Sequence, residues 1–167
     1  MINHREIFKL LPDKIINYIN TLEDMDKIQE LRIRLNRPVI IQTDKSEYVT
    51  AFKAKREDIS AVIQKISSYS IYAFEEDIKQ GFITFKGGHR IGICGECIIE
   101  DNKIKTIKNI SSLNIRIGKE FIGCSDFLIP FLKKDNRVLN TVIISPPKCG
   151  KTTLLRDITR NISNGNI

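Results

Sequence analysis

The stretch NTVIISPPKCGKTTLLRDITRN, residues 140–161, limits the fold more than any other part of this chain. The stretch begins inside a short apolar run, VLNTVIIS at residues 138–145. Such a run is typical of a strand buried on both faces of a parallel sheet. The residues from Lys151 to about Ser163 have the pattern of an amphipathic helix. This order of strand, loop and helix is the setting in which phosphate-binding loops occur.

The loop itself matches the phosphate-binding pattern G-x-x-x-x-G-K-[ST] at every position but the first, where Ser145 replaces glycine. We expect this first position to matter least, because it mainly turns the chain out of the strand. The predicted nucleotide-binding residues are Ser145, Pro146, Pro147, Lys148, Cys149, Gly150, Lys151, Thr152 and the neighbouring Thr153.

In a phosphate-binding loop, three of these residues are expected to act on the phosphates or on the bound ion. Gly150 lets the backbone pass close to the β-phosphate, where loop amides and the helix N-terminus converge on the anion. Lys151 places a charge on the β- and γ-phosphates, and the Thr152 hydroxyl ligates Mg²⁺ bound with the nucleotide. The predicted cofactors are therefore ATP and Mg²⁺. The alternative is an ordinary glycine-lysine turn that opens a helix, but the strand and helix around it favour nucleotide binding.

Hydrolysis needs more than this loop. It requires an acidic residue on another strand to hold Mg²⁺ and a residue to orient water. Only 15 residues follow Thr152, so we expect no second motif of this kind and no ATPase activity from this chain alone. Its catalytic residues are unknown from the sequence.

The preceding part of the chain predicts an α+β domain with a mostly antiparallel sheet. We place this domain at residues 1–134 and an incomplete P-loop domain of the RecA-like α/β type at 135–167, with the boundary within FLKKDNR (131–137), around residues 133–137. Periodicity predicts helices at 4–11, 12–20, 56–67, 72–80 and 125–134, and strands at 29–36, 37–43, 47–52, 81–85, 90–99, 103–107 and 112–117.

Charge and motifs weigh against several other functions. The net charge of +7 is spread along the chain, often beside acids, so solvated surface is favoured over a nucleic-acid footprint. Cys94 and Cys97 form a C-x-x-C, but no second pair accompanies them, and we interpret both as small buried hydrophobes in a strand. His89 is interpreted as a turn residue. The N-terminus has no apolar signal core, and we expect a cytoplasmic protein.

Four segments together resemble a known family. They are ELRIRLNRPV, YSIYAFEEDIKQGFITFKGGHRIGICGE, SSLNIRIGKEFIGCSD and LNTVIISPPKCGKTTLLRD. From about residue 28 to residue 160 the chain is similar to the stage III sporulation protein AA family of spore-forming Firmicutes. The serine-proline-proline opening of the loop resembles that family's own variant, whereas Lys148 stands where a glycine is expected.

The resemblance implies properties that the residues do not show by themselves. The family is similar to hexameric traffic ATPases of type II and type IV secretion, in which nucleotide is bound between an N-terminal domain and a RecA-like motor. It is thought to act in the mother-cell cytoplasm, at the membrane, on a channel complex that links mother cell and forespore. The resemblance implies as partners further copies of the chain, in a hexameric ring, and membrane proteins of this channel.

In related ATPases, arginines of the N-terminal domain reach the phosphates, which makes Arg90 and Arg116 candidates for the same role. A solvated strand arginine or an ion pair at the edge of the core is the alternative for each. The competing function is a nucleic-acid-binding module, with GICG at 92–95 as a GxxG motif, or an oligomerisation and docking module. Both would carry a non-catalytic P-loop fragment. The low aromatic content and the apolar setting of the GxxG argue against a nucleic-acid partner.

Overall fold

The chain divides into two compact units, Met1–Gly118 and Lys119–Ile167. The computed structural model describes residues 4–66, 75–118, 121–135, 137–147 and 149–165. The division lies before the boundary that the sequence suggested at residues 133–137, so the segment from 119 to 134 groups with the second unit. We describe each unit by itself.

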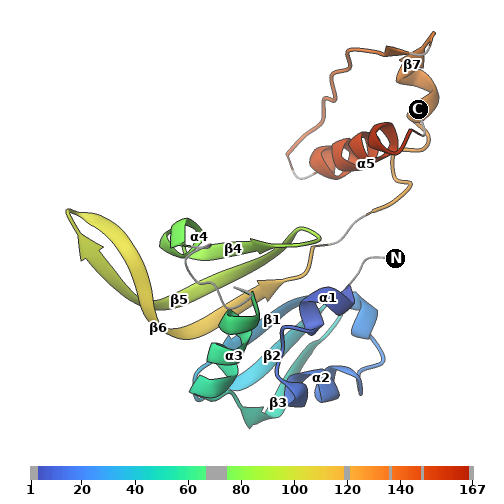
Figure 1. Ribbon diagram of the computed structural model, residues 1–167. Coiled ribbons are helices and arrows are strands. Elements are labelled where there is room, and N and C mark those ends of the chain that lie inside the picture. Colours follow the sequence, from blue (N-terminus) through green and yellow to red (C-terminus); the bar gives the residue numbers. More distant parts are fainter. Residues whose placement is uncertain (1–3, 67–74, 119–120, 136, 148, 166–167) are drawn as a thin grey trace. The chain divides into compact units, whose positions relative to one another are not determined.

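The first unit is built on a six-stranded antiparallel sheet in the order β3-β2-β1-β6-β5-β4 (Figure 1). Most of the predicted strands are present at the expected positions, and the sheet confirms the predicted α+β class of this part. The strands are β1 (Ile28–Arg34), β2 (Pro38–Thr43), β3 (Glu47–Lys53), β4 (Phe82–Phe85), β5 (His89–Glu100) and β6 (Lys103–Arg116).

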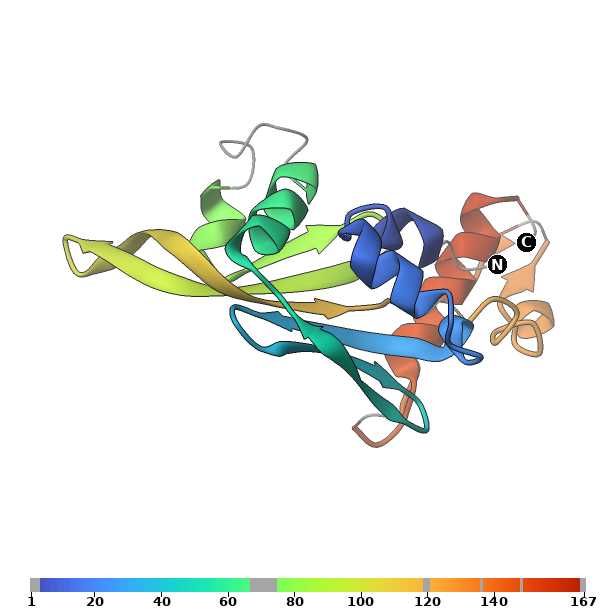
Figure 2. The ribbon, with the colours of Figure 1, turned by 90° about the horizontal axis from the view of Figure 1, so that it is seen from below.

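Four helices cover one face of this sheet, as Figure 2 shows, and the described residues of the unit place no helix on the other face. The first part of the predicted helix at 72–80 lies outside the described residues. The helices are α1 (His4–Phe8), α2 (Asp13–Ile19), α3 (Arg56–Ile66) and α4 (Glu75–Lys79), and η1 (Met25–Lys27) is a short 3₁₀ turn before β1.

Strand alternation decides which side chains form the core. In β1, Leu31 and Ile33 are fully buried beneath the helices, whereas Arg32 and Arg34 lie on the opposite, helix-free face. The helix α3 contributes the matching apolar stripe, with Ile59 and Val62 among its buried residues. The core is therefore one layer between the sheet and its helices, and the other sheet face carries the arginines together with a few apolar side chains, Ile40, Val49 and Phe82.

Strands β5 and β6 continue beyond the rest of the sheet as a long two-stranded ribbon (Figure 1). The sequence suggested two separate strands at 103–107 and 112–117, but β6 is continuous. The pairing with β5 shifts register between the Cys94–Ser112 pair and the Glu96–Lys108 pair. Asn109, which has a left-handed φ of 46°, lies in this irregular part of β6. At the ribbon tip Ile99 pairs with Ile104, and both side chains are exposed.

Gly95 is the residue of the ribbon that tolerates a side chain least. A Cβ atom there would lie 2.5 Å from the Lys108 carbonyl oxygen and 2.9 Å from Ile107 Cγ2. We expect Gly95→Ala to lower the free energy of unfolding by about 2 kcal/mol, because a backbone oxygen must move. Gly92→Ala is the matched control, since its nearest neighbours lie 3.7 Å away. Chemical denaturation of both variants checks this, and equal stabilities would contradict it.

The GxxG motif thus has a structural explanation. Both glycines lie inside β5, and Gly95 lets the two strands of the ribbon approach each other at a register shift. A KH-type GxxG clamps nucleic acid from a loop between helices. The setting of this motif is that of a strand irregularity.

Two interpretations of side chains in this region were wrong. Cys94 and Cys97 are exposed free thiols. Cys94 alternates with the buried Ile93 and therefore lies on the helix-free face, whereas Cys97 lies on the part of β5 that pairs only with β6, beyond the end of β1. His89 is the first residue of β5 and only 1% exposed. Its Nδ1 accepts a hydrogen bond from the Gly118 amide at 3.1 Å, so it fixes the end of β6 rather than forming the turn.

The second unit contains the helix α5 (Lys151–Ser163), which begins at Lys151 as the sequence predicts. The predicted helix at 125–134 is absent. Turns occupy residues 122–128, followed by the 3₁₀ helix η3 (Ile129–Phe131) and a small ladder of β7 (Lys133–Lys134) with β8 (Arg137–Val138). Pro130 explains the difference, because proline lacks an N–H and its ring clashes with the preceding turn of a helix.

The predicted strand at 138–145 is also absent, except for Val138 in β8. Residues 139–146 have no regular structure, and Val142 and Ile144 are 83% and 89% exposed. A strand needs partners for its backbone N–H and C=O groups, and no described strand of this unit lies beside the segment. The apolar composition therefore predicted a strand, but no described segment of this unit provides a neighbouring strand for it to pair with.

Candidate phosphate-binding site

The candidate site is the loop that leads into α5. Gly150 is the N-cap residue of this helix and has φ 79° and ψ 8°, the left-handed conformation. No described atom lies within 4 Å of the position that a Cβ would take. Glycine is therefore required here for its backbone conformation and not for lack of space. The first helical hydrogen bond runs from the Leu154 amide to the Gly150 carbonyl at 2.9 Å.

The start of α5 leaves backbone amides for a ligand. The first N–H groups of a helix have no intrahelical acceptor, and no described side chain caps Gly150. Lys151, Thr152 and Thr153 form the first turn, and the Thr152 side chain is exposed. The amides and the positive end of the helix dipole together favour an anion at this point.

Lys151 folds back over the loop. Its ammonium group donates to the carbonyl oxygens of Ser145 and Pro146, at 2.9 and 2.8 Å, and lies 3.4 Å from the Ser145 hydroxyl oxygen. Lysine thereby links the first two residues of the loop to its last. Ser145, which replaces the glycine of the common pattern, supplies two of these three oxygens, so the substitution is compatible with a closed loop.

The remaining loop residues have little packing of their own. Pro146, Pro147 and Cys149 are exposed, and the Cys149 thiol is 3.6 Å from the Pro147 carbonyl oxygen. Lys148 lies outside the described residues. The loop is thus defined by its two ends, the serine-proline start and the glycine-lysine helix cap.

A buried carboxylate fastens α5 to the segment before it. Asp157 is 5% exposed and accepts hydrogen bonds from the hydroxyl and the amide of Ser125, at 2.7 and 2.9 Å, and from the Gly123 amide at 3.2 Å. Arg160 adds two donors, the closer at 2.7 Å. The Ser125 hydroxyl, with help from Arg160 and the two amides, holds the pKa of Asp157 well below its usual range.

Cys124 lies beside this network. Its thiol points to the Thr153 carbonyl oxygen at 3.9 Å, next to the start of the helix. Burial raises the pKa of the Cys124 thiol, and the negative charge of Asp157 raises it further. Cys124 is therefore a neutral packing residue, and no sequence pattern had distinguished it or Asp157 as part of the site. Asp157 falls at an ordinary helix position, and only tertiary contact reveals its role.

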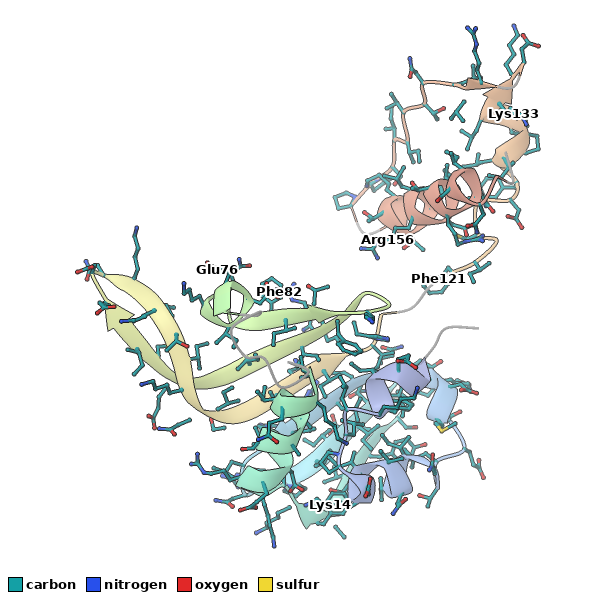
Figure 3. The ribbon with its side chains drawn as sticks, viewed as in Figure 1. Lys14, Glu76, Phe82, Phe121, Lys133 and Arg156 are labelled. Carbon is teal, nitrogen blue, oxygen red and sulfur yellow. The ribbon has the colours of Figure 1, made fainter. Side chains whose placement is uncertain are left out.

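A pocket of about 660 Å³ opens beside the loop. It is formed entirely within the second unit, by the turns before η3, the segment that leads into the loop, and the first turn of α5. Figure 3 labels Phe121, which belongs to the first of these walls. The lining residues are Phe121, Cys124, Phe127, Leu128, Ile143, Ile144, Ser145, Cys149, Gly150, Lys151, Thr153 and Leu154.

The two candidate arginines lie in the first unit, where they are direct cross-strand partners on β5 and β6. Both occupy the helix-free face. The Arg116 Nε donates to Glu30 at 3.3 Å, and the Arg90 guanidinium lies 3.7 Å above the ring of Phe82, labelled in Figure 3. The Arg116 side chain is 66% exposed, so this ion pair is of the weak surface kind.

Among the described residues, no group of three or more histidine, cysteine, aspartate or glutamate side chains could hold a metal ion. No helix in the described parts of the chain is long and apolar enough to cross a membrane.

Comparison with known proteins identifies the family. The sequence model of the family "Sporulation stage III, protein AA" matches residues 1–167. The chain belongs to this family. It is 40% identical over 163 residues to stage III sporulation protein AA of Bacillus subtilis, and 31% identical over 121 residues to the uncharacterized protein ycf45 of Cyanidium caldarium.

These relatives are longer than the chain. The matches cover 96% and 72% of this chain but 52% and 30% of the two relatives. Among solved structures, the ATPase DotB of Legionella pneumophila has a TM-score of 0.44 at 14% identity. The VirB11 ATPase of the Brucella suis type IV secretion system, solved with sulphate, has 0.40 at 13%. Each similarity covers 90% of this chain, and 41% and 44% of the other.

Proposed function

We propose that this chain is the ATP-binding portion of a sporulation ATPase. The observation that carries the proposal is the start of α5, where Gly150 takes the left-handed conformation that a phosphate-binding loop needs and is followed at once by Lys151 and Thr152. These residues belong to the motif that the sequence predicts, and the motif stands at the N-terminus of a 13-residue helix.

Each part of the loop has a task in phosphate binding. The amides of the first helical turn donate to phosphate oxygens, as at other helix N-termini. Lys151 exchanges its bonds to the Ser145 and Pro146 carbonyls for phosphate oxygens, which offer it a full negative charge in place of neutral dipoles. This exchange makes binding sensitive to the lysine in particular.

Mg²⁺ fits the site as a companion of the nucleotide. The exposed Thr152 hydroxyl would supply one oxygen ligand, with the phosphates and water as the others, as Mg²⁺ commonly requires. Bound there, the ion neutralises charge on the phosphates.

We propose that hydrolysis belongs to a longer polypeptide with a complete RecA-like motor, because the chain spans 52% of the Bacillus subtilis relative. In this proposal the protein assembles as a hexameric ring on the cytoplasmic, mother-cell side of the membrane. It energises a channel complex between mother cell and forespore through contacts with membrane proteins of that complex. Family membership supports the sporulation role, and the loop supports the use of ATP.

Direct binding tests the central part of the proposal. The chain is titrated with a fluorescent ATP analogue in the presence of Mg²⁺, alongside Lys151→Ala. Saturable binding that the substitution removes supports the proposal. A chain that is folded by circular dichroism but does not bind the analogue at millimolar concentration contradicts it.

Arg90 and Arg116 are proposed to reach the phosphates of the nucleotide in the complete motor. We expect Arg116→Ala, in the full-length protein, to lower ATP turnover by about a hundredfold, because a donor to developing negative charge is lost. Arg34→Ala is the matched control. Arg34 of β1 lies on the same face of the sheet and pairs with Ser112, four register positions from the Glu30–Arg116 pair. Steady-state ATPase assays measure both. Unchanged turnover and affinity in Arg116→Ala would remove it from the site and leave a surface ion pair with Glu30.

A further inference from the structure

The pocket beside the phosphate loop is placed to receive the rest of a nucleotide. It shares Ser145, Gly150 and Lys151 with the loop, so a ligand whose phosphates lie at the start of α5 has the pocket next to it. Its volume of about 660 Å³ falls in the range usual for small-molecule sites. The loop thus accounts for one end of the pocket, and the other end has no assigned role.

That other end is aromatic and aliphatic. Phe121 and Phe127 line it and are 56% and 66% exposed, together with the half-buried Leu128 and Leu154. Phenylalanine rings with this much surface in water, grouped at a concave site, mark a place where a flat apolar ligand is covered. A nucleobase has the required planar π surface.

The pocket offers few side chains that could read the edge of a base. Among the described residues that line it, none has an amide, carboxylate or imidazole side chain. Lys151 and Ser145 bond to each other at the loop end, and the Cys124 thiol is directed to the Thr153 carbonyl. Base selection normally depends on donors and acceptors aimed at the base edge, and an apolar pocket discriminates weakly.

We propose that this pocket is the base subsite of the nucleotide, and that it holds the base by stacking on Phe127 with little selection among bases. This inference rests on the proposed function, because the phosphates must be held by the loop for the base to reach the pocket. The ligand class is a nucleoside triphosphate in general rather than ATP alone.

The experiment compares a ligand with a base to one without. The chain is titrated by calorimetry with ATP, GTP, CTP and inorganic tripolyphosphate, all with Mg²⁺, as wild type and as Phe127→Ala. We expect wild type to bind the three nucleotides within about tenfold of one another, and each more tightly than tripolyphosphate. Phe127→Ala should lose about ten- to a hundredfold in nucleotide affinity and keep its tripolyphosphate affinity.

Two further variants separate stacking from folding. Phe131→Ala is the matched control, since this phenylalanine is 76% exposed on η3 and does not line the pocket. It should bind like wild type. Phe127→Leu keeps an apolar side chain but removes the ring, and we expect it to lose nucleotide affinity without loss of thermal stability.

The outcomes distinguish failure of the base subsite from failure of the proposed function. Equal wild-type affinities for ATP and tripolyphosphate would overturn the base subsite and leave the phosphate loop intact. Discrimination among the bases of more than about a hundredfold would overturn the stacking mode. A fall in stability of Phe127→Leu with unchanged nucleotide binding would make the pocket a packing surface. Absence of binding by every ligand would overturn the proposed function and this inference together.

Discussion

Replacing Lys151 with alanine should weaken binding of Mg²⁺–ATP by about a hundredfold or more. The ammonium group is the charged side chain of the loop that the structure places at the start of α5, where it bonds to the Ser145 and Pro146 carbonyls. A charge-assisted hydrogen bond to phosphate is roughly twice as strong as a neutral one. Alanine removes the charge and also the link that closes the loop.

The comparison must show that the loss is specific to the loop. Lys133→Ala, an exposed lysine of β7 in the same unit, removes the same charge elsewhere and should bind like wild type. Titration with the fluorescent analogue gives the affinities, and far-ultraviolet circular dichroism confirms that α5 is retained. Equal affinities for wild type and Lys151→Ala would mean that the glycine-lysine turn only opens a helix.

Replacing Asp157 with alanine should have the largest effect on stability in the second unit. The substitution leaves the Ser125 hydroxyl and amide, the Gly123 amide and the Arg160 guanidinium without their acceptor. Buried donors without acceptors are among the most destabilising consequences of a point mutation. We expect the melting temperature of this unit to fall by about 10 °C or more.

Thermal unfolding followed by hydrogen exchange at α5 measures the effect on this unit. Asp126→Ala is the matched control, because Asp126 is an exposed neighbour of the same turn. It should change little. Asp157→Asn keeps one acceptor oxygen and should lie between the alanine variant and wild type. Similar melting of Asp157→Ala and wild type would show that the network contributes little to holding α5.

Asp157 also predicts how the unit responds to acid. Its pKa is lowered from the ordinary value of 3.8 in the folded chain, so the unfolded chain binds more protons at low pH. The stabilisation is therefore fully present above the ordinary pKa and is lost as the pH falls towards the lower folded value. The protection of the α5 amides from hydrogen exchange, relative to the intrinsic rate at each pH, should fall in this range for wild type and much less for Asp157→Asn.

Local patterns in the sequence predicted those parts of the chain that local physics controls. The alternation of Leu31 and Ile33 with arginines fixed both the strand and its buried face, and the spacing of Ile59, Val62 and Ile63 did the same for α3. Gly150 followed by Lys151 predicted the start of α5 to the residue. Each of these signals depends on neighbours within a few positions.

The predictions from sequence were wrong for a helix, for a strand and for the burial of two cysteines. Apolar residues suggested a helix at 125–134, but Pro130 interrupts it, and the turns before it direct backbone amides to Asp157. The apolar run at 138–145 suggested a strand, yet a strand exists only when another strand pairs with its backbone. The cysteines of β5 were expected in the core, but Cys94 lies on the sheet face that no described helix covers, and Cys97 lies where the ribbon extends beyond the sheet.

The sequence alone determined the phosphate-loop motif, the family and the α+β class of the first unit. Each of these depends on particular residue types that recur at short, fixed spacings in the sequence. Only the tertiary structure decided that Asp157 holds α5 to Ser125, and that Phe127 and the loop share a pocket. It also decided that Arg90 and Arg116 are cross-strand partners. These relations join residues that are distant in the chain, and packing and hydrogen bonding between folded segments, rather than any local pattern, bring them together.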